Sequence, residues 1–160
     1  RLDDRAGAPA QRRGAQKNTE DDQAIGRSRG GLSTKIHALV DALGNPVAFH
    51  LTAGQATDLN GADAFLPNLT AKALLADRSF DVDARVVEPL QTAGIEPVIP
   101  SKRTRKRPRD YDRDLYKARH LIENFFCRLK QFRAIATRYD KRASNFLAGI
   151  YAAAILIWLN

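Results

Sequence analysis

The segment YKARHLIENFFCRLKQF, which begins at Tyr116, places an aromatic residue, two cations and a carboxylate at fixed spacings. At about 100° per residue, Tyr116, Arg119, Glu123 and Lys130 share a helical stripe roughly 60° wide. A carboxylate is a ligand for hard divalent cations, whereas Arg and Lys bind phosphate oxygens. The stripe is therefore a candidate for phosphodiester chemistry. The alternative is a solvated helix face, on which Arg119 and Glu123 form a weak i, i+4 ion pair.

A second carboxylate, Asp77, follows the apolar run ALLA. Ligands of open α/β sheets gather at the carboxyl ends of strands, so Asp77 is well placed for chemistry. The alternative is that Asp77 caps the strand end or pairs with Arg78. Together, Asp77 and Glu123 are oxygen ligands suited to Mg²⁺ (or Mn²⁺), and two such ions activate water and stabilise the leaving oxygen at a phosphodiester.

A long amphipathic helix is needed to hold the stripe, and the sequence predicts it over residues 115–133. Apolar residues recur at i, i+3, i+4 and i+7, which is the pattern of a helix packed on a core. The predicted core face consists of Ala118, Leu121, Ile122, Phe125, Leu129 and Phe132. The stripe lies opposite this face.

The other predicted elements alternate in type. Residues 33–52 form a hairpin whose turn is LGNP, TDLNGADAFLPNL is a short helix, and KALLADRSF is a mostly buried strand that emerges at Asp77. DVDARVVEPLQTAG is a helix that ends at Gly94, IEPVIPS is a strand, RAIATRYDKR is a connection, and SNFLAGIYAAAILIWLN is a buried closing helix. This order indicates an α/β fold with a mixed sheet flanked by helices.

The composition favours a polyanionic partner, because the 160 residues carry a net charge of +8. Residues 1–35 are net +3, residues 36–100 are net −5 and residues 101–142 are net +10. Basic flanks around an acidic centre suit a protein that holds phosphates with its flanks and metal with its middle. The candidate phosphate contacts in the flanks are Arg27, Arg29, Lys35, Lys102, Arg103, Arg105 and Lys106.

The single cysteine, Cys127, excludes a disulfide framework and is consistent with a cytoplasmic protein. The closing apolar run FLAGIYAAAILIWL is shorter than the ~20 residues that span a bilayer, so no membrane partner is expected. Residues 1–31 are predicted to be an irregular basic segment in which 26–31, GRSRGG, is flexible. Residues 32–160 are then one domain.

At these motifs the sequence resembles a known family. Tyr116-x2-Arg119-x3-Glu123-x6-Lys130 resembles the Tyr-Arg-Glu-Lys signature of bacterial insertion-sequence transposases of the DDE class. ADRSFD resembles the motif that carries the second acid of that family. GRSRGGLSTKIHALVDALGNPVAFHLTAGQATDL resembles the stretch between the first and second acids, and the likeness is greatest to the insertion-sequence-five group. The resemblance covers residues 24–160.

The resemblance implies a ribonuclease-H-like fold and metal-dependent cleavage and strand transfer on double-stranded DNA, at terminal inverted repeats and then at target DNA. Asp77 would be the second acid and Glu123 the third, with Tyr116, Arg119 and Lys130 supporting the DNA. The family often has His before the Asp of its GQ-x-x-D motif, whereas this chain has Thr57 before Asp58, so no role for that His carries over.

The first acid of the family has no clear counterpart here. Asp3 and Asp4 follow no apolar strand, and Asp41 reads as a turn residue beside LGNP. The resembled fold places the first strand in the middle of the sheet, next to the strand that carries the second acid. We therefore expect a truncated domain that lacks its central strand, is inactive alone and is marginally folded, with a two-metal site only if the first Asp is supplied.

Three functions remain open at this stage. The first is the catalytic portion of a transposase, which is active once it is joined to the missing part. The second is a non-catalytic DNA-binding fragment that inhibits intact transposase. The third is a general basic protein that binds RNA or DNA without preference for repeat ends. A homodimer or a pairing with intact transposase is expected from the family, because two element ends must be brought together.

Overall fold

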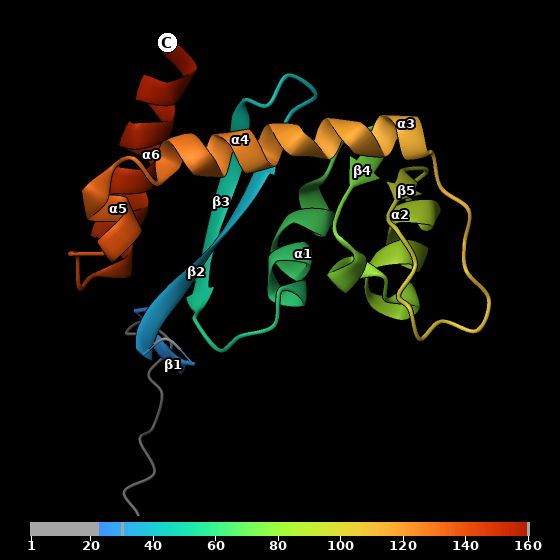
Figure 1. Ribbon diagram of the computed structural model, residues 1–160, viewed down its shortest axis with the longest axis horizontal. Coiled ribbons are helices and arrows are strands. Elements are labelled where there is room, and N and C mark those ends of the chain that lie inside the picture. Colours follow the sequence, from blue (N-terminus) through green and yellow to red (C-terminus); the bar gives the residue numbers. More distant parts are fainter. Residues whose placement is uncertain (1–22, 30, 160) are drawn as a thin grey trace, which may run out of the picture.

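The computed structural model describes residues 23–29 and 31–159, and it confirms the α/β class. The strands are β1 (Gly26–Ser28), β2 (Gly31–Val40), β3 (Pro46–Ala53), β4 (Ala73–Leu75) and β5 (Glu96–Val98). The α-helices are α1 (Leu59–Phe65), α2 (Glu88–Thr92), α3 (Arg113–Tyr116), α4 (His120–Leu129), α5 (Arg133–Thr137) and α6 (Ala143–Leu159). Figure 1 shows two sheets that stand apart, with the helix formed by α3 and α4 running past both.

The first sheet is antiparallel, in the order β1-β2-β3. The predicted hairpin is confirmed, and its turn is closed by Asp41, whose Oδ1 accepts the N–H of Leu43 at 2.8 Å and of Asn45 at 2.9 Å. Gly44 has φ +87°, a conformation that side chains disfavour. The predicted flexible segment 26–31 is corrected: residues 26–28 pair with 31–33 as a second, tighter hairpin.

The second sheet consists of β4 and β5, which run parallel. The predicted strand KALLADRSF is shorter and less buried than expected, because only residues 73–75 are extended and all three are half-buried. Residues 78–80 form a 3₁₀ turn instead. Within the described residues no strand joins the two sheets, and beyond residues 31–33 the edge of β2 opposite β3 has no strand partner.

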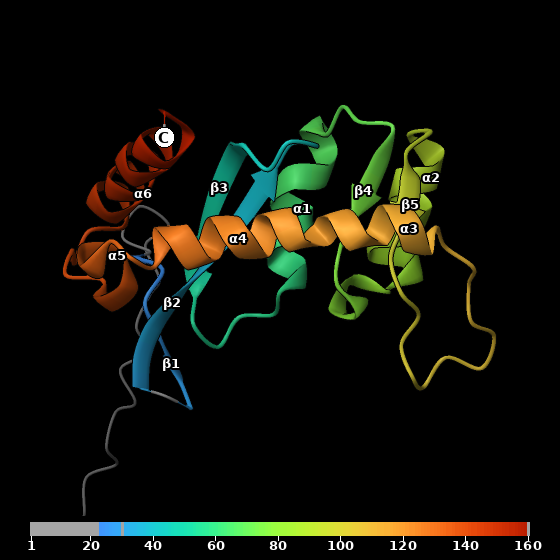
Figure 2. The same cartoon turned by 45° about the horizontal axis from the view of Figure 1, so that its top comes forward.

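The predicted long helix over residues 115–133 is present but runs over residues 113–129, as α3, a 3₁₀ turn over residues 117–119, and α4. Residues 130–132 lie between α4 and α5. The long helix starts at Asp112, whose Oδ1 accepts the N–H of Asp114 and of Leu115 and so caps the helix. Phe125 and Leu129 are buried, as the apolar pattern predicts. Figures 1 and 2 show that this helix extends from the three-stranded sheet to the two-stranded one.

Two separate hydrophobic cores lie under the helix. The first unites Phe49 of β3 with Phe125, Leu129, Ile135, Phe146 and Ile150 from α4, α5 and α6. The second unites Ala62, Val86, Leu90, Ile95 and Ile99 around α1, α2 and β5. A π-helical turn over residues 83–87 leads into α2, and Gly94 ends this region at φ +72°, where a helix end was predicted.

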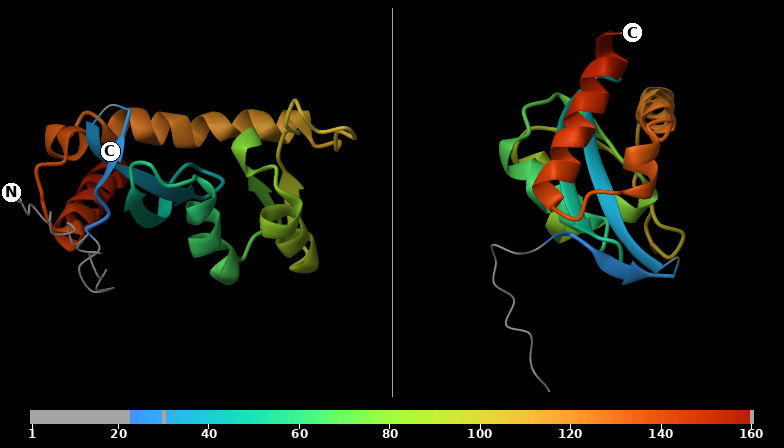
Figure 3. Two further views of the ribbon diagram at one scale, coloured as in Figure 1. Left: turned by 90° about the horizontal axis from the view of Figure 1, so that it is seen from below. Right: turned by 90° about the vertical axis from the view of Figure 1, so that its left-hand side faces the viewer.

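The C-terminal helices α5 and α6 lie at one end of the molecule, beside the first sheet (Figure 3). α5 forms inside a segment that was predicted to be a connection, and it ends at Arg138 with φ +48°. The predicted burial of α6 holds for one face only, because Trp158 and Leu159 on the other are 62% and 69% exposed. None of the described helices has the length and apolarity needed to cross a bilayer.

Candidate active site

The site begins with Asp77, two residues beyond β4. The N–H of Ala76 donates to the carbonyl of Val98 at 3.3 Å, so the parallel pairing continues up to the residue before Asp77. The chain then turns into the 3₁₀ helix of residues 78–80, in which the N–H of Phe80 donates to the Asp77 carbonyl at 2.9 Å. The Asp77 carboxylate is thus held at the carboxyl end of a strand and is half exposed.

Arg119 joins this carboxylate to the one on α4. Its Nε and Nη2 lie 2.8 Å from Oδ1 and Oδ2 of Asp77, and its Nη1 lies 2.7 Å from Oε1 of Glu123. The two acids, 46 positions apart in sequence, therefore meet on one guanidinium. The contact to Asp77 is bidentate, which is the strong geometry for Arg and carboxylate.

Tyr116 lies one helical turn before Arg119 and packs edge-on against Tyr111, with ring centroids 5.5 Å apart. Burial raises the pKa of the Tyr116 hydroxyl, and the charge of Asp77 adds to this effect. The phenol therefore stays protonated at neutral pH and is available as a hydrogen-bond donor near the carboxylates. Burial acts to lower the pKa of Arg119, but its contacts with Glu123 and Asp77 raise it, so Arg119 remains a cation.

Lys130, the last residue of the predicted stripe, follows α4 as its C-terminal cap and is exposed. It lies seven residues beyond Glu123, which corresponds to about 10 Å along a helix. The structure therefore brings Tyr116, Arg119, Asp77 and Glu123 together and leaves Lys130 further along the same helix.

The predicted phosphate contacts divide into exposed and internally paired residues. Arg27, Arg29, Arg103 and Lys106 are exposed, and Lys102 is half-buried. Figure 1 shows the loop that follows β5 at one end of the molecule and β1 near the other, so these residues form two groups rather than one patch.

Lys35 and Arg105 are paired within the chain, and their contacts with phosphate stay a prediction. Lys35 Nζ donates to the carbonyl of Ala56 and to Oδ1 of Asp58, both at 2.7 Å. Arg105 donates from Nε, Nη1 and Nη2 to the carboxylates of Asp81 and Asp83 at 2.8–3.0 Å. Each of these cations has an anion within the chain.

The sequence patterns did not indicate the partners of Lys35 and Arg105, which are Asp58, Asp81 and Asp83. Asp81 is fully buried and also accepts from Arg109, and no short-range spacing rule connects residues 24 or 28 positions apart. Arg138 was missed as well: its guanidinium donates to the carbonyl of Ala24 and to Thr34 Oγ1, tying the end of α5 to the first sheet. For Arg105 and Arg109 the signal was the basic run SKRTRKRPR, which did not separate internally paired arginines from exposed ones; Arg138 lies outside this run.

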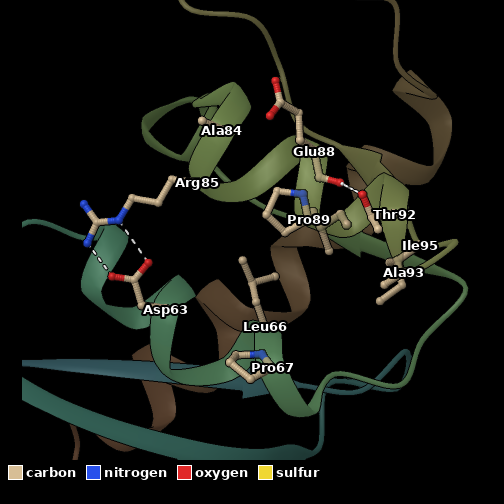
Figure 4. Close-up of a pocket in the computed structure, with 11 residues that line it drawn as sticks. Asp63, Leu66, Pro67, Ala84, Arg85, Glu88, Pro89, Thr92, Ala93 and Ile95 are labelled. Carbon is tan, nitrogen blue, oxygen red and sulfur yellow. Dashed lines mark hydrogen bonds and ion pairs between the residues drawn. The ribbon is translucent and has the colours of Figure 1, made fainter.

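An open groove of about 700 Å³ lies elsewhere, between α1 and α2 (Figure 4). Its floor is apolar, with Leu66, Pro67 and Pro89, and Arg85 pairs with Asp63 at its rim. Neither predicted catalytic carboxylate lines this groove. Its size therefore does not make it the site of the phosphodiester chemistry.

The carboxylates fit a divalent metal in type but not in number. Aspartate and glutamate oxygens are the ligands that Mg²⁺ and Mn²⁺ prefer. Among residues 23–29 and 31–159, however, no cluster of three His, Cys, Asp or Glu side chains could hold a metal ion. Asp41 closes a turn, and Asp3 and Asp4 lie outside the described residues, so none of the three weighed candidates for a first acid is placed at the site.

The chain is similar to known proteins over most of its length. The model of the family described as "Transposase DDE domain" matches residues 4–158. A Brucella ovis protein named as a candidate transposase of insertion sequence element IS6501 is 36% identical over 133 residues, which is 81% of this chain and 100% of that protein. A Burkholderia cepacia protein, named likewise for IS402, is 30% identical over 149 residues, 84% of this chain and 65% of that protein. No solved structure matches the chain. Because the family match includes both acids that Arg119 joins, and because both relatives are named for insertion sequences, the chain belongs to the DDE-domain transposases of bacterial insertion sequences.

Proposed function

We propose that this chain supplies the second and third acids, Asp77 and Glu123, of a metal-dependent site that cuts and joins DNA at insertion-sequence ends. The observation that carries the proposal is the meeting of these two carboxylates on Arg119. Members of the family are generally dependent on divalent metal and act on DNA. Divalent metal bound at the carboxylates would activate water and stabilise the leaving oxygen of a phosphodiester.

The residues around the acids have distinct parts in this proposal. Arg119 presents a planar fork that matches a phosphate, and Lys130 adds a point charge two turns further along α4. Tyr116 donates a hydrogen bond from its protonated hydroxyl. The exposed cations of the loop after β5, Arg103 and Lys106, hold the backbone of the same duplex, with Lys102 beside them.

The proposal includes a ribonuclease-H-like sheet that needs one more strand. The described part has two sheets, and an additional strand between β2 and β4 would join them and bring the first acid next to Asp77. Unpaired backbone groups cost about 1–3 kcal/mol each when buried, so the open edges weaken the domain. In this proposal residues 32–160 act as a catalytic domain only with that strand in place.

The test compares two proteins on a plasmid that carries the element ends, with Mg²⁺ present. One is the 160-residue chain, and the other is the same chain preceded by an apolar strand ending in Asp-Ser-Thr. We expect nicking at the repeat ends only with the added strand. Asp77→Asn or Glu123→Gln in that fusion should lower the rate at least about a hundredfold, because each removes a metal ligand.

DNA affinity is the control measurement in the same experiment. Both carboxylate variants should bind repeat-end DNA within about twofold of the parent, since Lys and Arg contacts supply most of the affinity. Mg²⁺-dependent nicking by the 160-residue chain alone would contradict the need for an added strand. Full activity of the Asp77→Asn and Glu123→Gln fusions would contradict the assignment of the acids.

A second function is favoured by the lack of a third ligand at the site among residues 23–29 and 31–159. In it the chain binds element ends without cutting them, or pairs with intact transposase, and lowers transposition. Adding the chain to an active transposase distinguishes the two functions. If the chain inhibits transposition and the Asp77→Asn and Glu123→Gln variants inhibit it equally, the non-catalytic function is favoured. If the added strand gives the chain nicking activity at the repeat ends, the catalytic function is favoured.

A further inference from the structure

Helix α6 has an apolar outer face that the described structure leaves open to solvent. No charged residue occurs between Ala143 and Leu159, and a helix that is apolar all round is normally buried on every side. Here Ile155, Trp158 and Leu159 are instead 55%, 62% and 69% exposed. Contiguous exposed apolar surface on a folded protein marks a site of interaction.

A groove of about 340 Å³ extends this surface from α6 toward β3. Tyr151 and Trp158 line it on the α6 side, and Val47, which is 58% exposed, lines it on the β3 side. Tyr151 packs edge-on against Phe49, with ring centroids 5.0 Å apart, and this contact fixes the wall of the groove. The open apolar surface is therefore wider than one helix.

The outer face of α6 has small residues in its first half and large ones in its second. Ser144, Ala148 and Ala152 are exposed and four positions apart, and Ile155 and Leu159 continue the same stripe. Two such helices fit one another when they run antiparallel, because the large side chains of each then lie opposite the small side chains of the other. A two-fold axis near Ala152 produces this arrangement.

The charges at the two ends of α6 favour the same orientation. Lys141 and Arg142, with Asp140 before them, give the exposed segment ahead of α6 a net charge of +1. At the other end the exposed Asp41 lines the groove together with Trp158. Antiparallel pairing brings the basic end of each helix to the acidic end of the other, and it also opposes the two helix dipoles.

We propose that the outer face of α6 and the groove beside it bind the same surface of a second copy of this chain, with the two α6 helices antiparallel. The inference goes beyond the proposed function, because neither Asp77 nor Glu123 lines this surface. The small side chain of Ala152 allows the helix axes to approach to about 8–10 Å. One helix face offers less than the roughly 800 Å² per partner of a standard interface, so we expect a dimer that dissociates on dilution.

Sedimentation velocity of the full 160-residue chain, from about 1 to about 200 µM, tests the proposal. The mass should rise with concentration from 17.7 kDa toward twice that value. Ala152→Glu places two like charges opposite each other at the axis and should weaken association at least about thirtyfold. Ala84→Glu makes the same change at an exposed position before α2, and it should alter association less than about twofold.

A second variant keeps the test decisive if Ala152→Glu fails to fold. Leu159→Ala removes apolar area from both halves of the interface and should weaken association at least about tenfold. Circular dichroism at low concentration, where the chain is monomeric, should give the same Tm for this variant and the parent within about 2 °C. A loss of association without a loss of folding is the expected result.

Cysteine crosslinking tests the orientation of the helices in a Cys127→Ser background. Ala152→Cys lies at the axis and should form a disulfide-linked dimer under mild oxidation. Two Leu159→Cys side chains would lie roughly 20 Å apart along antiparallel helices, and they should crosslink at least about tenfold more slowly. Parallel helices would bring the Leu159→Cys pair together instead.

Three outcomes would overturn the inference. A monomer at every concentration means that a second copy does not bind this face. Equal dimerisation of the parent, Ala152→Glu and Leu159→Ala means that the dimer forms through another surface. Faster crosslinking of Leu159→Cys than of Ala152→Cys means that the helices are not antiparallel. None of these outcomes bears on the nicking experiment, so the proposed function stands or fails separately.

Discussion

At the residue scale, Asp41 illustrates how a carboxylate outside the site is used. Its Oδ1 accepts the backbone N–H groups of Leu43 and Asn45, and its Oδ2 accepts the Asn45 side-chain amide at 3.0 Å. Partial burial acts to raise the pKa of Asp41, but the bonds from Asn45 and Leu43 lower it on balance below 3.8. The ionised carboxylate is therefore a structural part of the hairpin turn.

We expect the difference in unfolding free energy between the parent and Asp41→Ala to depend on pH. Asp41→Ala should lower the free energy of unfolding by about 1 kcal/mol at pH 7, because it removes hydrogen bonds to the turn. Since the folded-state pKa is lowered, this contribution is full above pH 3.8 and is lost as the pH falls through the folded-state value. Urea unfolding of the parent and Asp41→Ala at pH 7 and pH 3 measures this contribution. If the two proteins differ in unfolding free energy by the same amount at both pH values, the ionised carboxylate does not stabilise the turn.

At the element scale, the loop that follows β5 is fixed by a cluster of opposite charges. Asp81, with no exposed side-chain surface, accepts from the Lys102 N–H at 2.7 Å and from Arg105 at 2.8 and 2.9 Å. Arg109 also donates to Asp81 and to Asp83. Burial acts to raise the pKa of Asp81, but Arg105, the Lys102 amide and Arg109 lower it, so Asp81 is ionised. The cluster folds the basic loop back onto the turn after β4.

Removing this buried anion should release the loop. We expect Asp81→Ala to cost about 3 kcal/mol in unfolding free energy, because it removes the buried anion of the cluster and leaves Arg105 and Arg109 with the half-exposed Asp83 as their partner. Trypsin should then cut after Arg103 or Lys106 faster than in the parent. Asp63→Ala, which breaks the exposed pair with Arg85, is the matched control and should cost less than about 1 kcal/mol. Equal tryptic rates for the parent and Asp81→Ala would show that the cluster does not fix the loop.

At the scale of the whole molecule, stability depends on two cores, and α4 contributes Phe125 and Leu129 to the first of them. α6 completes the first core with Phe146, Ile150, Ala153, Ala154 and Ile157. Its opposite face exposes Ile155, Trp158 and Leu159 to solvent. The two faces are similarly apolar in sequence, yet only one of them contributes to the core of the described structure.

The two faces of α6 should respond differently to truncation. Ile150→Ala, at a position with no exposed surface, should cost about 3 kcal/mol through lost burial and the cavity left behind. That corresponds to a fall in Tm of roughly 6–12 °C for a domain of this size. Leu159→Ala, at a 69% exposed position, should cost less than about 0.5 kcal/mol. Thermal unfolding followed by circular dichroism measures the Tm of both variants. Equal falls in Tm would mean that the side chain of Leu159 is packed as closely as that of Ile150.

The elements with strong periodicity and the residues of the candidate site could be predicted from the sequence alone. The helix over residues 113–129 and the hairpin around Asp41 follow from apolar spacing and turn composition, because both are local properties of the chain. The stripe of Tyr116, Arg119 and Glu123 could be read for the same reason. The strand before Asp77 was found but overextended, because a short apolar run does not show where its pairing partner ends.

The tertiary structure decided which charges are free and which are used inside the molecule. Arg105 and Lys35 look like DNA contacts in sequence, yet their carboxylate partners lie 22–24 residues away and were visible only after folding. The bridge from Arg119 to Asp77 likewise joins residues 42 positions apart. Ion pairing depends on distance in space, and no periodicity along the chain encodes it. The separation into two sheets was decided at the same level, since strand pairing is a contact between distant segments.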